Sequence, residues 1–144
     1  MAGSLQSYSF KQVVVMIGEL PVEGFFEGDD AVMIERNNDT ATPLIGADGA
    51  TTVSVSGDDS AMVTLKLQPS SAANRFLENK HKQQRGGSVQ PFAVSVRDTT
   101  NGEGGSGPEA TIVQRPQRDF GSNVTVREWK IFVACWTDNE LEYA

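Results

Sequence analysis

The stretch SGDDSAMVTLKLQPSSAANRFLENK, from Ser56 to Lys80, carries the three local patterns that decide the fold of this chain. It opens with Gly57-Asp58-Asp59, where glycine permits unusual backbone angles and aspartate accepts hydrogen bonds from nearby amides, as in a turn. Apolar residues at every second position from Met62 to Leu67 then predict a half-buried strand. The last part has helical spacing, so the stretch predicts a turn, a strand and a helix in succession.

We predict one helix in the chain, about four turns long and packed on a sheet. Ser70 or Ser71, just after Pro69, can cap its first turn. The basic run Lys80–Arg85 suits the negative end of the helix dipole, and Gly86-Gly87 ends the helix. Its apolar stripe consists of Ala72, Ala73, Phe76 and Leu77.

Alternation of apolar and polar residues with a period of two dominates the rest of the chain, as in strands with one buried face. The pattern predicts a mainly β protein: an antiparallel β-sandwich or barrel-like domain with one flanking α-helix and long loops. A length of 144 residues suits a single domain over residues 1–144. The predicted strands are Gln12–Ile17, Ala31–Arg36, Thr52–Ser56, Met62–Leu67, Phe92–Arg97, Ala110–Arg115 and Glu128–Cys135.

Two polar stretches are predicted to be long loops. Asn37–Gly49 contains Pro43 and two glycines, and a loop of this length is usually functional. Asp98–Pro108 contains Asn101-Gly102 and the run Gly104–Gly107, which predict a flexible hairpin loop.

The chain is acidic, with a net charge of −7 and an isoelectric point near 4.6. Because affinity for nucleic acid comes mostly from neutralising phosphates, this balance argues against a general DNA-binding protein. Acids dominate residues 1–60, whereas bases outnumber acids over residues 61–130. This uneven distribution is compatible with head-to-tail contact between copies.

The number of cysteines and the length of the apolar runs indicate in which cellular compartment the protein is found. Cys135 is the single cysteine, and its apolar neighbours predict a small buried side chain rather than a reactive thiol. Met1–Gln6 holds neither a basic region nor an apolar stretch, so we expect no signal peptide. The longest apolar run, Val13–Ile17, is too short to cross a bilayer. We therefore expect an intracellular protein with no membrane partner.

The Gly-Asp-Asp triplets at 28–30 and 57–59 raise the question of catalysis, since paired carboxylates bind metal ions in phosphoryl-transfer enzymes. We favour turns, because each triplet precedes a strand-like run and the chain is too short for a polymerase. His81, the one histidine, lies at the predicted helix end without a serine–histidine–acid context. No lysine–serine or lysine–threonine pair follows Gly102–Gly107, which argues against a phosphate-binding loop. We expect no enzyme activity, no catalytic or metal-binding residue and no cofactor.

The two tryptophans belong to the predicted C-terminal strand region. Trp129 is predicted to lie in the core, whereas Trp136 suits either the core or an interface. The basic run Lys80–Arg85 could touch nucleic acid, but a solvated helix end or an ion-pairing contact between subunits is the more usual role.

Three segments together resemble the tail tube proteins of contractile-tailed bacteriophages, from about Tyr8 to Trp136. The middle segment is the most specific, because it joins a turn, a strand of alternating threonine and aliphatic residues, and a short helix that ends in Phe76-Leu77. The loop Asp98–Pro108 and the stretch Arg115–Gly121 depart from the simplest members of the family. The three segments are YSFKQVVVMIGELPVEGFFEGDDAVMIER, GADGATTVSVSGDDSAMVTLKLQPSSAANRFL and FGSNVTVREWKIFVA.

The resemblance implies a structural virion protein built as a β-sandwich with a flanking helix. In this family a hexameric ring joins strands of each subunit into an inner barrel, and rings stack into a tube through which DNA is ejected; the type VI secretion tube is similar. The implied partners are further copies of the chain, the tail sheath outside, and the baseplate and tail terminator at the ends. The lumen holds the tape measure protein and then DNA, without specific binding. The implied location is the phage tail, after assembly in the cytoplasm of the host bacterium.

Two other interpretations stay open. A tail terminator, baseplate hub or sheath-initiating component of the same particle shares the fold and differs in capping an end. A monomeric β-sandwich binding module, such as a carbohydrate binder, needs a patch of exposed aromatic side chains. The candidates for such a patch are Tyr8, Tyr143 and Trp136.

We expect the loop Asn37–Gly49 to be an arm that reaches the adjacent ring or subunit, with a mobile surface loop as the alternative. The candidate arm residues are Asn37, Asp39, Pro43, Ile45 and Asp48.

A wall that lets DNA slide should carry net negative charge, so some acids are expected to line the lumen. The candidates are Glu19, Glu23 and Glu35, with Glu128 a weaker choice because Lys130 lies beside it. The alternative is that these acids face the sheath or pair across subunit contacts with arginines. Those arginines are Arg97, Arg115 and Arg127.

Overall fold

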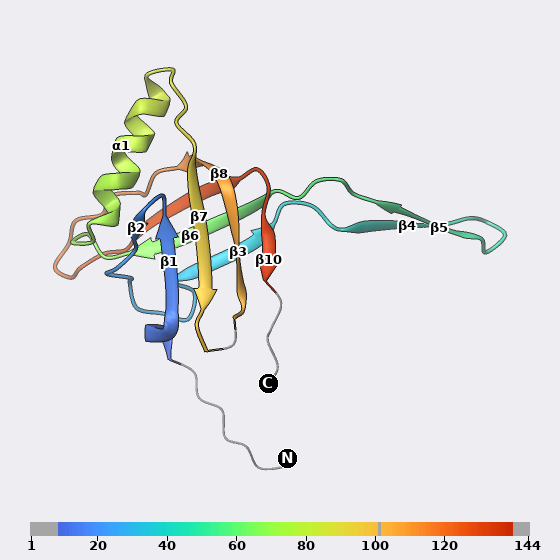
Figure 1. The fold of residues 1–144 in the computed structure, drawn as a ribbon, viewed down its shortest axis with the longest axis horizontal. Coiled ribbons are helices and arrows are strands. Elements are labelled where there is room, and N and C mark those ends of the chain that lie inside the picture. Colours follow the sequence, from blue (N-terminus) through green and yellow to red (C-terminus); the bar gives the residue numbers. More distant parts are fainter. Residues whose placement is uncertain (1–8, 101, 140–144) are drawn as a thin grey trace, which may run out of the picture.

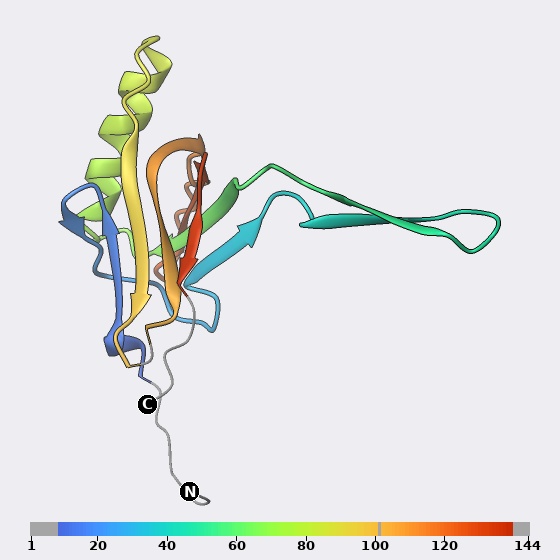
Figure 2. The same ribbon diagram turned by 45° about the vertical axis from the view of Figure 1, so that its right-hand side comes forward.

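The computed structural model describes residues 9–100 and 102–139. One strongly curved antiparallel sheet and one helix, α1 (Ala73–Arg85), form a body from which a two-stranded hairpin extends far outward (Figure 1). The helix lies on one side of the body and the hairpin leaves on the opposite side, as a second view also shows (Figure 2). The prediction of a mainly β, antiparallel protein with one flanking helix is confirmed for the described residues.

The strands of the body follow the order β2-β1-β7-β8-β9-β6-β3, and β10 pairs with β8 beside this path. A short 3-10 turn, Phe10–Gln12, precedes the first strand. The strands are β1 (Val13–Ile17), β2 (Leu20–Pro21), β3 (Val32–Arg36), β6 (Ala61–Leu67), β7 (Phe92–Asp98), β8 (Gly104–Gln114), β9 (Arg127–Val133) and β10 (Thr137–Asn139).

The long strand β8 folds the sheet into two halves that pack on each other. Its first part pairs with β7 and its last part with β9, and Ala110 faces both Phe92 of β7 and Val133 of β9. The register shifts in both ladders, as bulges do where a sheet bends. The apolar faces of β1 and β7 therefore share one core with those of β6 and β9.

The core forms where the alternating apolar residues of these strands meet under α1. Trp129 of β9 is fully buried, and its indole Nε1 donates to Oδ1 of Asn74 on the helix at 2.9 Å. Because the indole N–H has a hydrogen-bond partner, the largest side chain of the core can be buried without leaving a polar group unsatisfied. The prediction of Trp129 as a core residue is confirmed. Trp136 is also buried, so it does not belong to an exposed aromatic patch, and the other candidates for that patch, Tyr8 and Tyr143, lie outside the described residues.

Helix α1 begins two residues after Ser71, whose Oγ accepts a hydrogen bond from the amide of Ala73 at 3.3 Å. It ends at Arg85, and Gly87 has a φ of +94°, a value that favours glycine. Gln84 ties the helix to β8, because its Nε2 donates to the carbonyl of Ile112 at 2.8 Å. The predicted helix and its glycine stop are thus observed, with a slightly later start.

The hairpin consists of β4 (Ala41–Ile45) and β5 (Thr51–Val55). The prediction of an irregular loop over Asn37–Gly49 is therefore wrong over β4, since Pro43 is tolerated in a hairpin whose outer edge is open. The predicted strand Thr52–Ser56 exists, but its half-buried character is wrong, because every residue of β5 is exposed. We call residues 37–58 the arm.

The second predicted loop, Asp98–Pro108, is shorter than expected. Residues 99–103 connect β7 to β8, and Gly104–Gly107 belong to β8. A β-carbon on Gly105 would lie 2.6 Å from the Trp136 indole, and one on Gly107 would lie 2.1 Å from a methyl group of Val133. These glycines serve close packing against the end of β9 and the segment that follows it, not flexibility.

Candidate assembly surfaces

The first Gly-Asp-Asp triplet forms a turn before β3, as predicted. Asp30 Oδ2 accepts a hydrogen bond from Nζ of Lys66 on β6 at 2.6 Å. This bond from Lys66 lowers the pKa of the Asp30 carboxyl below its ordinary value. The carboxylate fastens the turn to the sheet.

The second triplet joins the arm to β6 in a segment without a turn, so the prediction of a turn is wrong there. The Asp58 carboxylate accepts hydrogen bonds from the amide of Ser60 at 2.8 Å and from the side chain of Asn38. The bonds from Ser60 and Asn38 lower the pKa of the Asp58 carboxyl. Within residues 9–100 and 102–139, no three histidine, cysteine, aspartate or glutamate side chains gather as metal ligands do.

The arm has one apolar and one more polar face, set by its pairing register. Ala41 faces Val55, Pro43 faces Val53 and Ile45 faces Thr51 on one side of the ribbon. Val55 is 76% exposed and Ile45 70% exposed. Leu44, on the other face, is 68% exposed. Large exposed apolar patches are typical of surfaces that contact another chain, so the arm is a candidate contact surface.

The root of the arm is fixed to the body by Arg36 at the end of β3. Its guanidinium donates to the carbonyl of Asp59 and to the carboxylate of Asp138, both at 2.8 Å. The backbone amide of Trp136 donates to the same Asp59 carbonyl at 2.9 Å, and its indole Nε1 to Asp138 at 2.8 Å. The direction in which the arm leaves the body is therefore set by a bonded network.

Both ends of the curved sheet are open edges. Among the strands of the described residues, β3 pairs only with β6, and successive residues Met33 and Ile34 are both exposed although they point to opposite faces. At the other end β2 pairs with just two residues of β1, and Val14 of β1 is exposed. Open edges with apolar side chains are templates for pairing with another chain.

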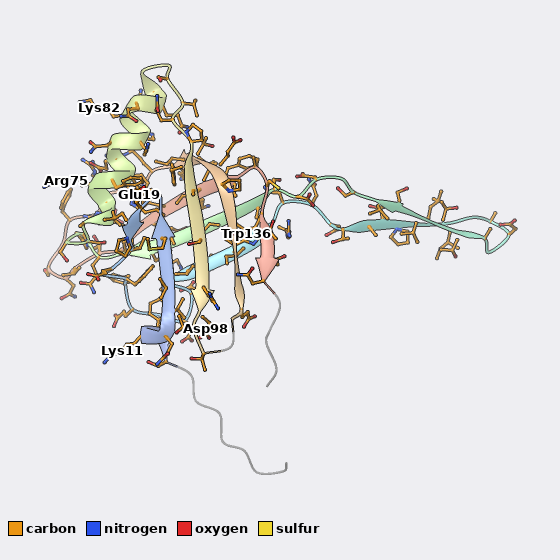
Figure 3. The ribbon with its side chains drawn as sticks, in the orientation of Figure 1. Lys11, Glu19, Arg75, Lys82, Asp98 and Trp136 are labelled. Atoms are coloured by element: carbon orange, nitrogen blue, oxygen red, sulfur yellow. The ribbon has the colours of Figure 1, made fainter. Side chains whose placement is uncertain are left out.

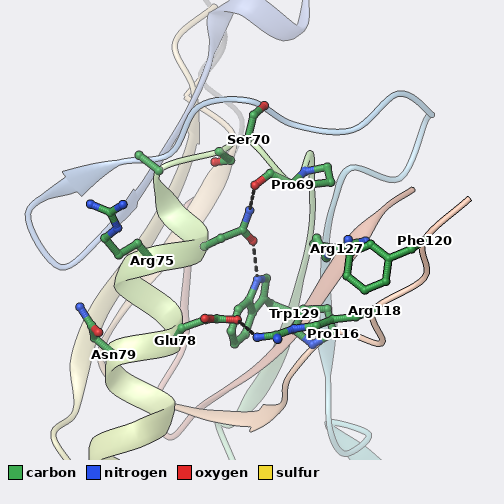
Figure 4. Close-up of a pocket in the computed structure, with 13 residues that line it drawn as sticks. Pro69, Ser70, Arg75, Glu78, Asn79, Pro116, Arg118, Phe120, Arg127 and Trp129 are labelled. Atoms are coloured by element: carbon green, nitrogen blue, oxygen red, sulfur yellow. Dashed lines mark hydrogen bonds and ion pairs between the residues drawn. The ribbon is translucent and has the colours of Figure 1, made fainter. Parts of the chain in front are cut away.

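A basic groove of about 640 Å³ lies between α1 and residues 115–127 (Figure 4). Helix α1 is on the side of the body away from the arm (Figures 1 and 2). Arg75 extends from the helix, whereas Arg118 and Arg127 come from the other wall (Figures 3 and 4). Trp129 contributes to the floor, and Phe120, 86% exposed, stands at the rim with Arg127 over its ring at 5.6 Å.

A single carboxylate, Glu78, holds two arginines at this groove. Oε1 of Glu78 accepts from Arg115 at 2.8 Å and from Arg118 at 2.6 Å. Burial raises the pKa of Glu78, but its bonds to Arg118 and Arg115 outweigh this effect and leave that pKa below its ordinary value. One negative charge thus faces two positive ones, and the groove keeps a positive surplus.

His81 lies on α1 beside the same cluster. Burial, together with the charges of Arg115 and Arg85, lowers the pKa of His81. It therefore adds little charge to the basic side of the molecule at neutral pH. This matches the prediction of a histidine at a basic helix end, apart from its partial burial.

The predicted lumen acids do not lie together in one copy. Glu19 is in the β1–β2 turn and Glu23 follows β2, whereas Glu35 is on β3 at the opposite end of the strand order. These three side chains are exposed, and Glu128 on β9 is half-buried opposite Lys66. Their role at a lumen stays a prediction.

Sequence reasoning missed the groove and misplaced one residue. Arg118 and Phe120 lie in a stretch without strand or helix, so no periodic pattern marks them. The run Val32–Ile34 was a usable signal for the open edge, because three apolar residues in succession put apolar side chains on both faces of a strand. Cys135 is exposed, contrary to the prediction, because β9 ends at Val133 and the alternation stops with it.

Over the described residues, no helix has both the length and the apolar character needed to cross a bilayer. The described surface of this chain holds two open sheet edges, an apolar arm and a basic groove.

These features define a class of protein: a curved β-sandwich with one flanking helix, open sheet edges and an exposed apolar arm. Solved structures share the fold. The sheath/tube terminator of PVC, an extracellular contractile injection system, aligns with a TM-score of 0.67 at 12% identity, covering 96% of this chain and 100% of that chain. The tube-terminating cap of the anti-feeding prophage AFP aligns at 0.66 and 12%, covering 96% and 95%. A chain of the PVC sheath-tube complex aligns at 0.61 and 14%, covering 94% and 93%.

The sequence comparisons identify the family. Residues 5–139 match the family described as Bacteriophage PhiTE tail tube protein, and the chain belongs to this family. Structural protein ORF10 of Pseudomonas phage KPP10 is 29% identical over 139 residues, which cover 91% of this chain and 80% of that protein. The resemblance to phage tail tube proteins seen in the sequence is thereby confirmed at the level of the family.

Proposed function

We propose that the chain is the self-assembling subunit of a phage tail tube, in which hexameric rings stack around a bore for DNA. The observation that carries the proposal is the pair of open, apolar sheet edges, β3 at one end and β1 at the other. When β3 of one copy meets the β1 edge of the next, each copy uses two different surfaces. Such heterologous contacts close into rings when the rotation between copies allows it.

The faces of β1 support this arrangement. Val15 and Ile17 are buried in the core of the chain, whereas Val14 on the opposite face is exposed. A subunit in a ring covers the second face with a neighbour. The tail sheath outside, the baseplate and terminator at the ends, and the tape measure protein and DNA in the lumen are the partners this role requires.

A tail terminator is the second candidate function. It is favoured by the solved structures, because a sheath/tube terminator and a tube-terminating cap align at TM-scores of 0.67 and 0.66, against 0.61 for the sheath-tube complex. A terminator caps one end of a tube and forms a single ring. A tube subunit repeats along the whole tail, so the copy number in the particle separates the two.

The test is electron microscopy of the purified chain in negative stain over a range of concentration and salt. A tube subunit forms rings and, at higher concentration, open-ended tubes of many rings. Single rings that never stack, together with one ring per particle by quantitative mass spectrometry, identify a terminator. A chain that stays monomeric under every condition contradicts both functions.

A further inference from the structure

The charges of this acidic chain are separated in space. The arm, residues 37–58, holds three carboxylates and no lysine or arginine. The two segments that form the basic groove, residues 69–85 and 115–127, hold seven lysines and arginines against two acids. The arm acids are Asp39, Asp48 and Asp58. Of the seven bases in the two segments, three line the groove, namely Arg75, Arg118 and Arg127. The other four are Lys80, Lys82, Arg85 and Arg115.

The two charged surfaces lie on opposite sides of the body. α1 and the groove are on one side, and the arm extends away on the other, in both views of the ribbon (Figures 1 and 2). The bonded root at Arg36 sets that direction, so an arm does not reach the groove of its own chain. A complementary pair of surfaces placed in this way connects one copy to the next.

The tip of the arm suits a groove in size and charge. Between Gly46 and Ala50, Asp48 is the one residue whose side chain extends beyond a methyl group. Its Oδ1 accepts from the amide of Ala50 at 3.0 Å, which fixes the turn. Ile45, an exposed aliphatic residue just behind the tip, offers an apolar side chain to the exposed ring of Phe120 at the groove rim.

The groove presents cations that are not neutralised within the chain. Arg75 has no hydrogen-bond or ion-pair partner among residues 9–100 and 102–139, and Arg115 and Arg118 share the single carboxylate of Glu78. An incoming carboxylate meets a net positive field there, and opposite charges across an interface fix its register.

We propose that the arm tip of one copy docks in the basic groove between α1 and residues 115–127 of a second copy. Asp48 lies among the groove arginines, and Ile45 covers Phe120. The contact rests on the proposed self-assembly and adds to it the identity of the surface that receives the arm. Repetition of this heterologous contact links every copy to two others.

A charge swap tests the contact at physiological salt. Asp48→Arg and Arg75→Glu, each alone, should raise the protein concentration needed for half-assembly on the order of tenfold or more, because each change places like charges opposite one another in the contact. The double variant should return it to within about threefold of the wild type, because the pair is restored in reverse. Asp29→Arg, the same change on an exposed turn of the body, is the matched control and should assemble normally.

Disulfide capture tests the same geometry without relying on assembly of tubes. In a Cys135→Ser background, copies that carry only Asp48→Cys are mixed with copies that carry only Phe120→Cys and oxidised. The expected product is a mixed dimer, and replacing Asp48→Cys by Asp29→Cys should abolish it.

The outcomes separate this proposal from the proposed function. Tubes that form normally from both charge variants, with no mixed dimer, overturn the docking site and leave the tube function standing. Normal self-assembly combined with lost binding of the sheath protein assigns the groove to the sheath and also overturns the proposal. A wild-type chain that neither assembles nor yields the mixed dimer contradicts the docking site and the tube function together.

Discussion

Single residues in this chain owe their role to what packs against them. Gly105 is the clearest case, because the Trp136 indole lies where its β-carbon would be. The sequence showed a glycine run with an asparagine–glycine pair before it, which is equally typical of a flexible loop. The deciding contact comes from residues about thirty positions away, and no local pattern contains it. Trp129, by contrast, was predictable from the alternation of its own strand.

Gly105→Ala should therefore destabilise the fold by about 1–3 kcal/mol, because the added methyl group forces the tryptophan or the backbone to shift. Thermal unfolding followed by circular dichroism measures the change. Gly121→Ala is the matched control, since nothing lies within 4 Å of its added β-carbon. Equal melting temperatures for the two variants would show that the glycine serves something other than packing.

Acid should weaken the fold through two neighbouring groups on α1. His81 has a lowered pKa, so the unfolded chain takes up its proton first and stability falls as pH drops below the ordinary histidine value of 6.5. Glu78 also has a lowered pKa, so its stabilising contribution, present above 4.5, is lost as pH falls through its folded pKa. Urea unfolding between pH 7.5 and 3.5 measures both steps. His81→Gln should remove the first step alone, and an unchanged profile would exclude His81 as its source.

At the scale of elements, the sequence predicted whether a segment is a helix or a strand better than it predicted whether that segment is buried or exposed. The helix and the strands of the body follow from periodicity, because burial of one face imposes it. The strand β5 has the same alternation, Val53 and Val55 between polar residues, but no core lies beneath it. Alternation of apolar and polar residues predicts that one face of a strand is covered. It does not predict whether that face is covered by the same chain or by another chain. The sequence therefore predicted where the arm lies along the chain, but not that it is a two-stranded hairpin.

Replacing residues 41–55 by a short Gly-Ser turn should leave folded subunits or rings while abolishing tubes. The amide of Ser56 donates to the carbonyl of Thr40 at 2.8 Å, so a short link can join these ends without strain on the body. Negative-stain imaging measures tubes, and circular dichroism checks the fold. Normal tubes from this variant would show that the arm is dispensable.

At the scale of the whole molecule, the positions of the candidate lumen acids could not be predicted from the sequence. Glu19 and Glu23 lie near one end of the sheet order and Glu35 at the other, so one copy holds no common acidic surface formed by the three. Edge-to-edge contact between copies is the arrangement that would bring these ends together. The location of a lumen is a property of the assembly, which explains why neither periodicity nor charge count could place its lining.

If those acids line the bore, changing Glu19, Glu23 and Glu35 together to lysine should leave rings assembled and slow DNA ejection. The effect should be larger at low salt, because phosphate attraction is screened over about 8 Å at physiological ionic strength. Ejection from phage particles that carry the variant measures it.

An equal charge change elsewhere provides the control for this experiment. The triple variant Glu27→Lys, Asp29→Lys and Glu109→Lys alters exposed acids outside the candidate set. It should eject DNA at the wild-type rate. Mapping of Glu19, Glu23 and Glu35 to the outer surface of an assembled tube would contradict the prediction directly.

The proline of the arm has a consequence for the chain before it assembles. A long, exposed two-stranded ribbon of alternating valine, serine and threonine is the kind of segment that recruits further strands and aggregates. Pro43 lies in the middle of β4, facing Val53, and offers no amide to an added strand. Before a newly made copy assembles, Pro43 therefore lowers the tendency of the exposed arm to add further strands and form amyloid-like stacks.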